Sequence, residues 1–584
     1  MKMTGAQAII ESLICEGVTI VFGYPGGTIL PTYDALFTKK EQIHHVLVRH
    51  EQGAAIAAEG YAKSSNKIGV CFATSGPGAT NLVTGIADAM LDSVPIVCIT
   101  GQVASTLIGS DAFQEADIIG ITIPITKWNY QVTRAKDIPE VLAKAFHYAR
   151  EGRPGPVLID ITKDAQMDTL DFVYHPHRPL KYQTLVCPDS QFIEIAQIIN
   201  EAKRPLILAG NGIGIANAEA ELLELVEKAT IPCAVTLHGL HNFPSKHPLF
   251  VGLLGMHGNY APNIMTNKAD VIIAIGMRFD DRVTGNLSKY AKQAKIIHID
   301  IDQAEINKNV KSFIELNTDA KYALQNLLKY VETNTHSAWR KQFQNLHDEE
   351  EHKVIAPELA RGGASLRMSQ AIAELSRQSA GNAIIVSDVG QNQMIAARYY
   401  KFNQAKSHIT SGGLGTMGFA LPASIGAAIA NPQRQVVCVV GDGGIQMNIQ
   451  ELAVITQEKL PVKILLLNNG YLGMVRQWQE MFYDERYSFV DLVNPDFIQL
   501  ANAYGIKGLR ISHPDELDAA ISTMLQSTEA FLLEVVVERR EKVFPMMPAG
   551  AGVDEIMLSS PIEDPESVKG ESEYQKNLLT QEPK

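Results

Sequence analysis

Two polar motifs, each at the end of an apolar run, are the strongest chemical feature of this 584-residue sequence. Gly441-Asp442-Gly443 follows the run 435–440, and Asn468-Asn469 follows the run 462–467. Apolar residues at helical spacing between them predict a strand–helix–strand crossover, which places both motifs at one edge of a parallel sheet. Open α/β sheets bind ligands at that edge, and Mg²⁺ prefers oxygen ligands shared with phosphates. The pair therefore predicts a magnesium diphosphate site, although either motif alone would indicate an ordinary turn.

Apolar runs that alternate with helical patterns predict an α/β protein with three doubly wound parallel-sheet domains. The other expected strands lie at 19–22, 45–48, 69–73, 95–100, 157–161, 206–212, 271–275 and 295–299. The expected boundaries give domains at 1–165, 190–332 and 365–550, linkers at 166–189 and 333–364, and a C-terminal segment at 551–584. That last segment is expected to form a lid and then a disordered tail, because its end is rich in Glu, Lys, Ser and Pro.

Composition limits the classes of function. The net charge of -13 argues against nucleic-acid binding. No apolar run approaches the roughly 20 residues that span a bilayer, and residues 1–16 do not resemble a signal peptide, so we expect a cytoplasmic protein. The cysteines lack a Cys-x-x-Cys pair and are expected to be reduced core thiols: Cys15, Cys71, Cys98, Cys187, Cys233 and Cys438.

The metal motif resembles the signature of thiamine diphosphate-dependent enzymes. From about residue 5 to 558 the chain is similar to the catalytic subunits of acetohydroxyacid synthase, also called acetolactate synthase. The resemblance implies a pyrimidine-binding first domain, a central FAD-binding domain and a diphosphate-binding third domain. It also implies a transferase that decarboxylates pyruvate and joins the two-carbon unit to pyruvate or 2-ketobutyrate, in branched-chain amino acid synthesis. A homodimer or homotetramer with intersubunit active sites, and a small regulatory subunit, are further implications.

Glu51, in Arg49-His50-Glu51-Gln52, opens a predicted helix after a strand. Taken alone, it would more often complement the helix dipole. The resemblance instead assigns it to the cofactor's aminopyrimidine ring, where a carboxyl group favours the imino tautomer. Pro77 and Asn81, in the Gly-rich turn 74–81, would line the same ring. Gly27 and Lys163 are also expected at this site.

The third domain is expected to hold the diphosphate and the metal. Asp442, Asn469 and Tyr471 are the predicted metal ligands. The resemblance assigns Met417 to propping the cofactor into its bent shape, although a lone methionine is normally core. The remaining cofactor contacts are expected from Gln391, Asn392, Gly413, Gly441, Gly443 and Gly444.

Carboligation requires a site for the second substrate. The resemblance assigns the incoming carboxylate to Arg278, in the run 276–282, because a guanidinium grips carboxylates bidentately. The alternative is a charged turn in which Arg278 and Arg282 pair with neighbouring aspartates. Apolar and polar walls around the substrates are expected from Phe113, Gln114, Met256, Met474 and Trp478. Met474 and Trp478 lie one helical turn apart, which also fits plain core packing.

The central domain resembles a flavin-binding domain through Gly210, Gly212, Arg278 and Asp300, and the implied FAD is structural. Four positions depart from the family pattern: Ile56 and Asn392 replace histidine, Gly444 replaces serine and His241 replaces glycine. We expect weaker cofactor affinity from Asn392, rather than loss of binding.

Two other functions remain open from the sequence. One is a related thiamine enzyme such as pyruvate oxidase or glyoxylate carboligase, against which Arg278 and Trp478 argue. The other is a catalytically silent paralogue that serves as a scaffold or regulatory partner. Intact Glu51, Asp442 and Asn469 argue against that second reading.

Overall fold

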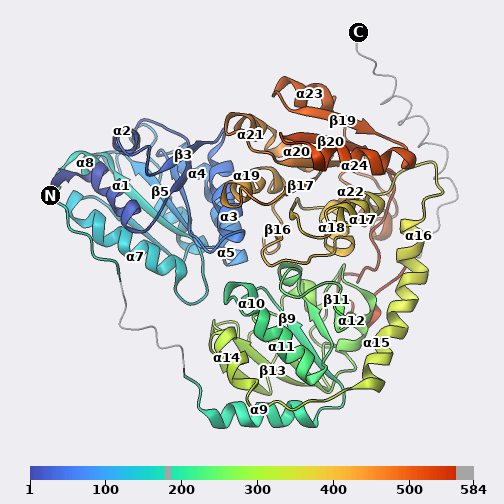
Figure 1. Ribbon diagram of the computed structural model, residues 1–584. Coiled ribbons are helices and arrows are strands. Elements are labelled where there is room, and N and C mark those ends of the chain that lie inside the picture. The colour runs from blue at the N-terminus through green and yellow to red at the C-terminus, as the bar shows by residue number, and fades with distance from the viewer. Residues whose placement is uncertain (178–185, 561–584) are drawn as a thin grey trace.

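The computed structural model describes residues 1–177 and 186–560, and within them the chain forms three α/β domains around three parallel six-stranded sheets. In Figure 1 the first domain is blue at the left, the central domain green at the bottom, and the third domain orange to red at the upper right. The predicted fold class is confirmed. The predicted tail lies outside the described residues from residue 561 onward.

The first domain has the strand order β3-β2-β4-β5-β7-β6. Its strands are β2 (Ile20–Gly23), β3 (His44–Leu47), β4 (Gly69–Ala73), β5 (Ile96–Gln102), β6 (Trp128–Val132) and β7 (Val157–Thr162). Its helices are α1 (Gly5–Cys15), α2 (Leu30–Phe37), α3 (Glu51–Lys63), α4 (Pro77–Asn81), α5 (Val83–Asp92), α6 (Ile118–Thr122), α7 (Ile138–Arg150) and α8 (Lys163–Met167). Five strands match the sequence expectation, whereas the edge strand β6 was not predicted.

The third domain repeats this order as β16-β15-β17-β18-β20-β19. Its strands are β15 (Ile384–Ser387), β16 (His408–Thr410), β17 (Val436–Gly441), β18 (Lys463–Asn468), β19 (Lys507–Ile511) and β20 (Phe531–Val536). Its helical segments are α17 (Met368–Gln378), α18 (Gln391–Tyr399), α19 (Ala420–Ala430), α20 (Asp442–Met447), η6 (Ile449–Glu451), α21 (Leu452–Gln457), α22 (Gly473–Phe482), α23 (Phe497–Ala503) and α24 (Leu517–Gln526). The predicted crossover is confirmed, because β17 and β18 are parallel neighbours.

The central domain has a different order, β11-β10-β9-β12-β13-β14. Its strands are β9 (Pro205–Ala209), β10 (Cys233–Val235), β11 (Phe250–Leu253), β12 (Val271–Ile275), β13 (Lys295–Asp300) and β14 (Ile314–Asn317). Its helices are α9 (Asp189–Glu201), α10 (Gly212–Ile215), α11 (Glu219–Ala229), α12 (Tyr260–Thr266), α13 (Asp281–Thr284) and α14 (Ala320–Leu327). Numbered along the chain this is 3-2-1-4-5-6, the order of dinucleotide-binding folds, whose ligand crevice lies where the order reverses, here between β9 and β12.

The first domain extends past the expected boundary at residue 165. The short strand β8 (Thr169–Asp171) pairs antiparallel with β1 (Lys2–Thr4), so both ends of the domain are joined. Between the second and third domains run α15 (Ser337–Glu350) and α16 (Ala356–Leu359), visible along the right side of Figure 1. The predicted second linker is therefore largely helical.

Small residues let α3 of the first domain and α19 of the third pack with their backbones in close approach. A Cβ atom on Gly60 would lie 2.0 Å from the carbonyl oxygen of Ala423, and one on Gly426 would lie 1.8 Å from that of Ala57. No methyl group fits at these distances, so glycine is required at both crossing points. The contact places the first and third domains of one chain side by side.

The cysteines divide by burial. Cys71, Cys98, Cys233 and Cys438 are buried as predicted, whereas Cys15 is exposed and Cys187 is half-buried. Among the described helices, none is long and apolar enough to cross a membrane.

Candidate active site

The structure brings Asp442 and Asn469 together at the carboxyl edge of the third sheet. Asp442 begins α20 directly after β17, and Asn469 follows β18. The side chain of Asn494 donates to Asp442 Oδ2 at 2.7 Å and to Asn468 Oδ1 at 3.1 Å, which ties the two strand ends together. Tyr471 N donates to Asn469 Oδ1 at 3.1 Å, so the three predicted metal ligands form one turn-and-strand cluster.

The donor set suits a hard cation. Burial raises the pKa of Asp442 to about 6, and hydrogen bonds from Asn494 and the backbone of residues 469 and 470 oppose that rise. A bound divalent cation would offset the cost of burying this carboxylate. Among the described residues no group of three or more His, Cys, Asp or Glu is placed to hold a metal. One carboxylate with amide and carbonyl oxygens is instead the kind of set that Mg²⁺ shares with phosphates.

The predicted diphosphate contacts other than Gly413 lie around this edge. Gln391 is buried and accepts a hydrogen bond from Asn469 Nδ2 at 3.1 Å. A Cβ atom on Gly443 would lie 3.7 Å from Met417 Cε, so Met417 reaches over the Gly441–Gly443 turn. Asn392 uses its Nδ2 group internally, donating to Asp388 O at 2.8 Å.

Gly444 faces Asp388, since a Cβ atom on Gly444 would lie 2.6 Å from Asp388 Oδ1. Asp388 is itself held by the backbone N–H groups of Gly418 and Ala420 at 3.0 and 2.9 Å. The glycine that departs from the family pattern therefore fits closely against a buried carboxylate.

Glu51 lies at the carboxyl edge of the first sheet, as the first residue of α3. Its side chain is almost fully buried, and Asn81 Nδ2 donates to Glu51 Oε2 at 2.9 Å. A Cβ atom on Gly78 would lie 3.3 Å from Glu51 Oε1, so a larger residue at position 78 would crowd the carboxyl. The predicted pair Glu51 and Asn81 is therefore assembled, with Pro77 opening the helix that carries Asn81.

Gly27 and Lys163 lie at the same edge. The neighbouring Thr28 hydroxyl lies 3.0 Å from the hydroxyl of Thr74, which starts the Gly-rich turn. Gln166, in the helix that Lys163 opens, donates to Thr28 O at 2.9 Å. Among the described residues, none comes within 4 Å of a Cβ position on Gly27 apart from its chain neighbours, so this glycine borders open space there.

Phe113 and Gln114 occupy a loop beside the Gly-rich turn. A Cβ atom on Gly76 would lie 2.8 Å from the carbonyl oxygen of Gln114. The Phe113 side chain is 87% exposed. Within one chain these two residues therefore border the Glu51 edge.

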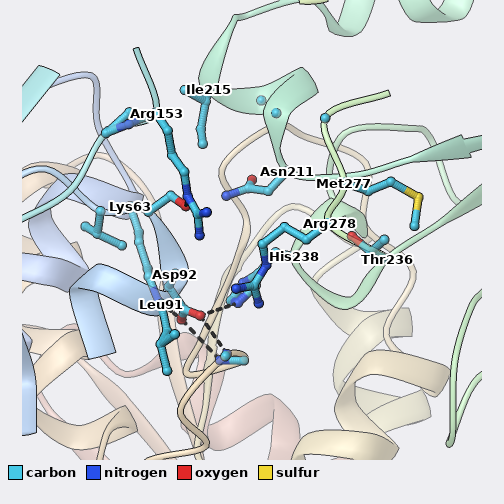
Figure 2. A pocket seen from close by; sticks show the side chains of 18 of the residues that line it. Lys63, Leu91, Asp92, Arg153, Asn211, Ile215, Thr236, His238, Met277 and Arg278 are labelled. Carbon is cyan, nitrogen blue, oxygen red and sulfur yellow. Dashed lines mark hydrogen bonds and ion pairs between the residues drawn. The ribbon is translucent and has the colours of Figure 1, made fainter. Parts of the chain in front are cut away.

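A cavity of about 1590 Å³ separates the three domains and collects the remaining predicted residues. Its lining includes Met256, Arg278, Met474, Trp478, Gly212, Asp300 and Gly413. Figure 2 shows side chains from the first domain, Lys63, Asp92 and Arg153, and from the central domain, His238 and Arg278, directed into it. The volume exceeds the roughly 300–1,000 Å³ of ordinary small-molecule sites, so it can take an extended ligand and a substrate together.

Arg278 is available for a ligand because its neighbouring aspartate is used elsewhere. Asp280 caps α13, accepting hydrogen bonds from the backbone N–H groups of Arg282 and Val283. The nearest Arg278–Asp280 distance is 4.0 Å, and Arg282 lies 3.8 Å from Asp281 with both side chains exposed. The charged-turn alternative therefore describes only long, weak pairs.

The two predicted glycines of the central domain have different roles. A Cβ atom on Gly210 would lie 2.1 Å from Gly276 O, so this glycine permits the close approach of two turns. Gly212 meets Gly276 similarly at 2.5 Å and also lines the cavity. Asp300 ends β13 at the cavity wall, and burial raises its pKa to about 6.

Asp92 lines the cavity and joins all three domains. Sequence reasoning did not identify this residue. Lys63 Nζ lies 2.7 Å from Asp92 Oδ2, and His238 Nε2 lies 3.0 Å from Oδ1. The N–H groups of Gly412 and Gly413 also donate to this carboxylate, at 3.1 and 2.7 Å. Burial alone would raise the pKa of Asp92, but His238 and Lys63 hold it well below its ordinary value. Gly413, predicted at the diphosphate, docks onto Asp92 within this chain.

Glu451 is a second residue that sequence reasoning missed. Its carboxylate reaches from the third domain to the first and accepts the N–H of Arg49 at 3.1 Å. A Cβ atom on Gly53 would lie 2.8 Å from Glu451 Cδ. Burial raises the pKa of Glu451 to about 7, against the opposing hydrogen bonds from Arg49 and His50. Only its position nine residues after Asp442 could have drawn attention to it.

Three family models of thiamine pyrophosphate enzymes match the chain: the N-terminal TPP binding domain at residues 3–121, the central domain at 193–327 and the C-terminal TPP binding domain at 388–535. The acetolactate synthase isozyme 2 large subunit of Escherichia coli is 43% identical over 95% of this chain and 99% of that protein. The chain belongs to the acetolactate synthase large-subunit family of thiamine pyrophosphate enzymes.

Other members of this family are similarly close. The acetolactate synthase large subunit of Lactococcus lactis is 46% identical over 95% of this chain and 96% of that protein. Acetolactate synthase 1 of Nicotiana tabacum, a chloroplastic protein, is 45% identical over 95% of this chain and 84% of its own length. The family assignment agrees with the thiamine diphosphate site that the sequence motifs predicted.

Proposed function

We propose that this protein is the catalytic subunit of an acetolactate synthase, which decarboxylates pyruvate and transfers the two-carbon unit to a second 2-keto acid. The product is 2-acetolactate from pyruvate, or 2-aceto-2-hydroxybutyrate from 2-ketobutyrate, for branched-chain amino acid synthesis. The observation that carries the proposal is Arg278, held on a cavity wall beside Met256, Met474 and Trp478 in a chain of this family.

Thiamine diphosphate, when bound, supplies the carbon that takes up the acyl unit of pyruvate as carbon dioxide leaves. Glu51 holds a proton at the ring nitrogen of the aminopyrimidine, and Asn81 orients the Glu51 carboxyl by its 2.9 Å hydrogen bond. Asp442, Asn469 and the carbonyl oxygen of Tyr471 would hold Mg²⁺, which would neutralise charge on the diphosphate. Met417, which lies over the Gly443 turn, would support the cofactor in its bent shape.

Arg278 binds the carboxylate of the acceptor keto acid, because its guanidinium is always charged and can form two parallel hydrogen bonds. Met256, Met474 and Trp478 supply apolar surface on the same cavity, which excludes water and favours carboligation over protonation. Trp478 favours 2-ketobutyrate as acceptor by filling space around the additional methyl group.

FAD is the proposed resident of the central-domain part of the cavity. The dinucleotide-type strand order, the close glycine approach at Gly212 and the cavity volume support this assignment. His241 lines the same wall and is half-buried, and desolvation lowers its pKa to about 3, so a neutral imidazole faces the flavin region. The net reaction moves no electrons, so the flavin's role is structural.

The proposed active unit is a homodimer or homotetramer in which Glu51 of one chain meets Asp442 of another. Exposed apolar side chains surround both half-sites, which supports a contact between chains. Around the Glu51 edge these are Tyr24, Leu30, Leu107, Ile108 and Phe113, and around the Asp442 edge Met447, Phe482, Tyr483, Phe489 and Val493.

A small regulatory subunit is a further proposed partner, since the relatives are named large subunits. The buried thiols of Cys71, Cys98, Cys233 and Cys438 suit a reducing compartment, which supports a cytoplasmic location.

The test is a turnover assay on purified protein with thiamine diphosphate, Mg²⁺, FAD and pyruvate. We expect carbon dioxide and acetolactate, and with 2-ketobutyrate added, mostly 2-aceto-2-hydroxybutyrate. Formation of acetaldehyde alone would refute carboligation. Consumption of an electron acceptor in proportion to pyruvate would instead identify a pyruvate oxidase, and no turnover at all would favour a silent paralogue.

A further inference from the structure

A chain of buried side-chain amides joins the metal-site residue Asn469 to the C-terminal part of the protein. We call residues 541–547 the C-terminal strap. Asn469 Nδ2 donates to Gln391 Oε1 at 3.1 Å, and Gln391 Nε2 donates to the strap at Glu541 O, 2.7 Å away. Gln391 Nε2 also lies 3.4 Å from Gln477 Oε1. Asn469, Gln391 and Gln477 are all buried, so water cannot replace these partners.

Gln477 binds the strap as a peptide group would. Val543 N donates to Gln477 Oε1 at 2.9 Å, and Gln477 Nε2 donates to Val543 O at 3.2 Å. Both ends of the amide are therefore paired with one backbone residue. Gln477 lies between Met474 and Trp478 on α22, the helix that carries two of the predicted substrate walls.

The direction of this chain of hydrogen bonds follows from the strap backbone. An amide side chain can present either its oxygen or its nitrogen, but a backbone N–H can only donate and a carbonyl can only accept. Val543 N therefore selects the oxygen of Gln477, and Glu541 O selects the nitrogen of Gln391. Gln391 must then present oxygen to Asn469, which turns the Asn469 amide oxygen away from Gln391. That oxygen accepts Tyr471 N at 3.1 Å and keeps a second lone pair for a cation.

The strap also forms part of the cavity's surroundings. Met547 N donates to Met256 O at 2.8 Å, and Phe544 and Met546 form a buried cluster against which Trp478 packs. The same seven residues thus contact two predicted substrate walls and, through two glutamines, the predicted metal ligand.

We propose that Gln477 is a positioning residue of this active site. It fixes the strap against α22 and, with Gln391, sets the Asn469 amide so that oxygen faces the metal. Metal binding and closure of the substrate wall are thereby coupled. The proposal rests on the metal site of the proposed function, but not on the identity of the keto acids.

The test uses Gln477→Met, which keeps the length of the side chain and removes both hydrogen-bonding ends. Mn²⁺ binding in the presence of thiamine diphosphate, measured by electron paramagnetic resonance, is expected to weaken by about tenfold, as for other residues that orient metal ligands. Trypsin cleavage near Arg540 and Lys542 is the second measurement. Mn²⁺ with thiamine diphosphate should slow cleavage of the unmodified protein and should have little effect on the variant.

Gln479→Met is the matched control. Gln479 lies on the same helix and makes the same pair of hydrogen bonds, both at 3.1 Å, to the backbone of Ser488. It should lower thermal stability without changing Mn²⁺ affinity. Gln477→Glu retains an acceptor for both Val543 N and Gln391 Nε2, so it should keep most of the affinity.

Unchanged Mn²⁺ affinity and unchanged metal protection in Gln477→Met would overturn the proposal, as would equal loss in Gln479→Met. These measurements need no turnover. If carboligation fails while Mn²⁺ binding responds as expected, the proposed function is wrong and the role of Gln477 stands; the reverse result removes only the role of Gln477.

Discussion

At the scale of single residues, the choice of hydrogen-bond partner decides which side chains remain available for chemistry. Asp280 serves as a helix cap, so the adjacent Arg278 keeps its guanidinium for the cavity. Glu51 accepts a hydrogen bond from the side chain of Asn81. Its other oxygen lies over Gly78, where a larger residue would crowd it. Which groups are available for chemistry therefore depends on the hydrogen bonds of neighbouring residues as well as on residue type.

Glu51→Gln should leave folding intact and reduce acetolactate formation by at least about a hundredfold, because an amide cannot hold the proton at the aminopyrimidine nitrogen. Far-ultraviolet circular dichroism and the turnover assay check both parts. Glu59→Gln, the same change in the same buried helix, is the control and should keep nearly full activity. Full activity in Glu51→Gln would dismiss the proposed role.

Glu451 should make stability depend on pH. Its pKa rises on folding from 4.5 to about 7, so the folded chain holds this proton more tightly. The resulting stability is complete below about pH 4.5 and is lost as pH rises through about 7, by at most about 3 kcal/mol. Glu451→Gln should therefore gain thermal stability relative to the unmodified protein across that range. A difference in melting temperature between the two proteins that stays the same at every pH would contradict the assignment.

At the scale of elements, two of the junctions between domains are sensitive to side-chain size or charge. The α3–α19 crossing depends on Gly60 and Gly426. A second junction depends on Arg398 of α18, which lies 2.6 Å from Glu350 of α15 and also donates to His257 O at 2.8 Å. His257 follows Met256 in the chain, so the second junction also fixes the backbone beside this predicted substrate-wall residue.

Gly426→Ala should destabilise the protein by about 1–3 kcal/mol or more, because the added methyl would overlap the carbonyl oxygen of Ala57. The displaced α3 should also lower thiamine diphosphate affinity through Glu51. Thermal melts and fluorescence titration measure the two effects. Gly362→Ala, at a position with open space around it, is the control and should change neither.

Arg398→Met should cost about 3–5 kcal/mol, since it leaves Glu350 charged and buried without its partner. Glu350→Met added to Arg398→Met should restore part of that stability by removing the unpaired charge. Recovery will be incomplete because the carbonyl of His257 also loses its donor. A double variant no more stable than Arg398→Met would show that the ion pair is not the source of the loss. Denaturant midpoints provide the comparison.

At the scale of the whole molecule, the proposed homodimer requires each chain to carry two half-sites. Glu51 and Asp442 lie at the carboxyl edges of different sheets, and each edge is bordered by exposed apolar side chains. A second chain can complete both sites by matching the first-domain edge of one molecule to the third-domain edge of the other. The arrangement is reciprocal, as expected for a twofold interface.

Mixing Glu51→Gln chains with Asp442→Asn chains should restore activity. Each mixed dimer has one site with both substitutions and one with neither, so equal, random mixing should recover about a quarter of the unmodified activity. Each variant alone should remain nearly inactive. No recovery after subunit exchange, verified by mass spectrometry of the mixed dimer, would show that each site is built within one chain.

Much of this molecule could be predicted from local pattern. The strand-ending motif at Asp442 was recognisable because strand, turn and helix signals surround it in sequence. Local pattern also placed Glu51 at the start of a helix, whereas its role came from the family resemblance. Gly413 lies against Asp92, and β8 pairs with β1, through contacts between distant parts of the chain, so neither placement was foreseeable. Gln477 and Glu451 likewise lack a motif, because their partners are backbone groups far along the sequence.

The identical strand order of the first and third sheets means that these two domains have the same topology. Two six-stranded folds with the same winding lie on either side of a differently wound central fold in one polypeptide, which is the arrangement that tandem duplication of one domain would produce. At matching carboxyl edges of the two sheets, the first presents the Glu51 carboxyl and the third presents Asp442 and Asn469.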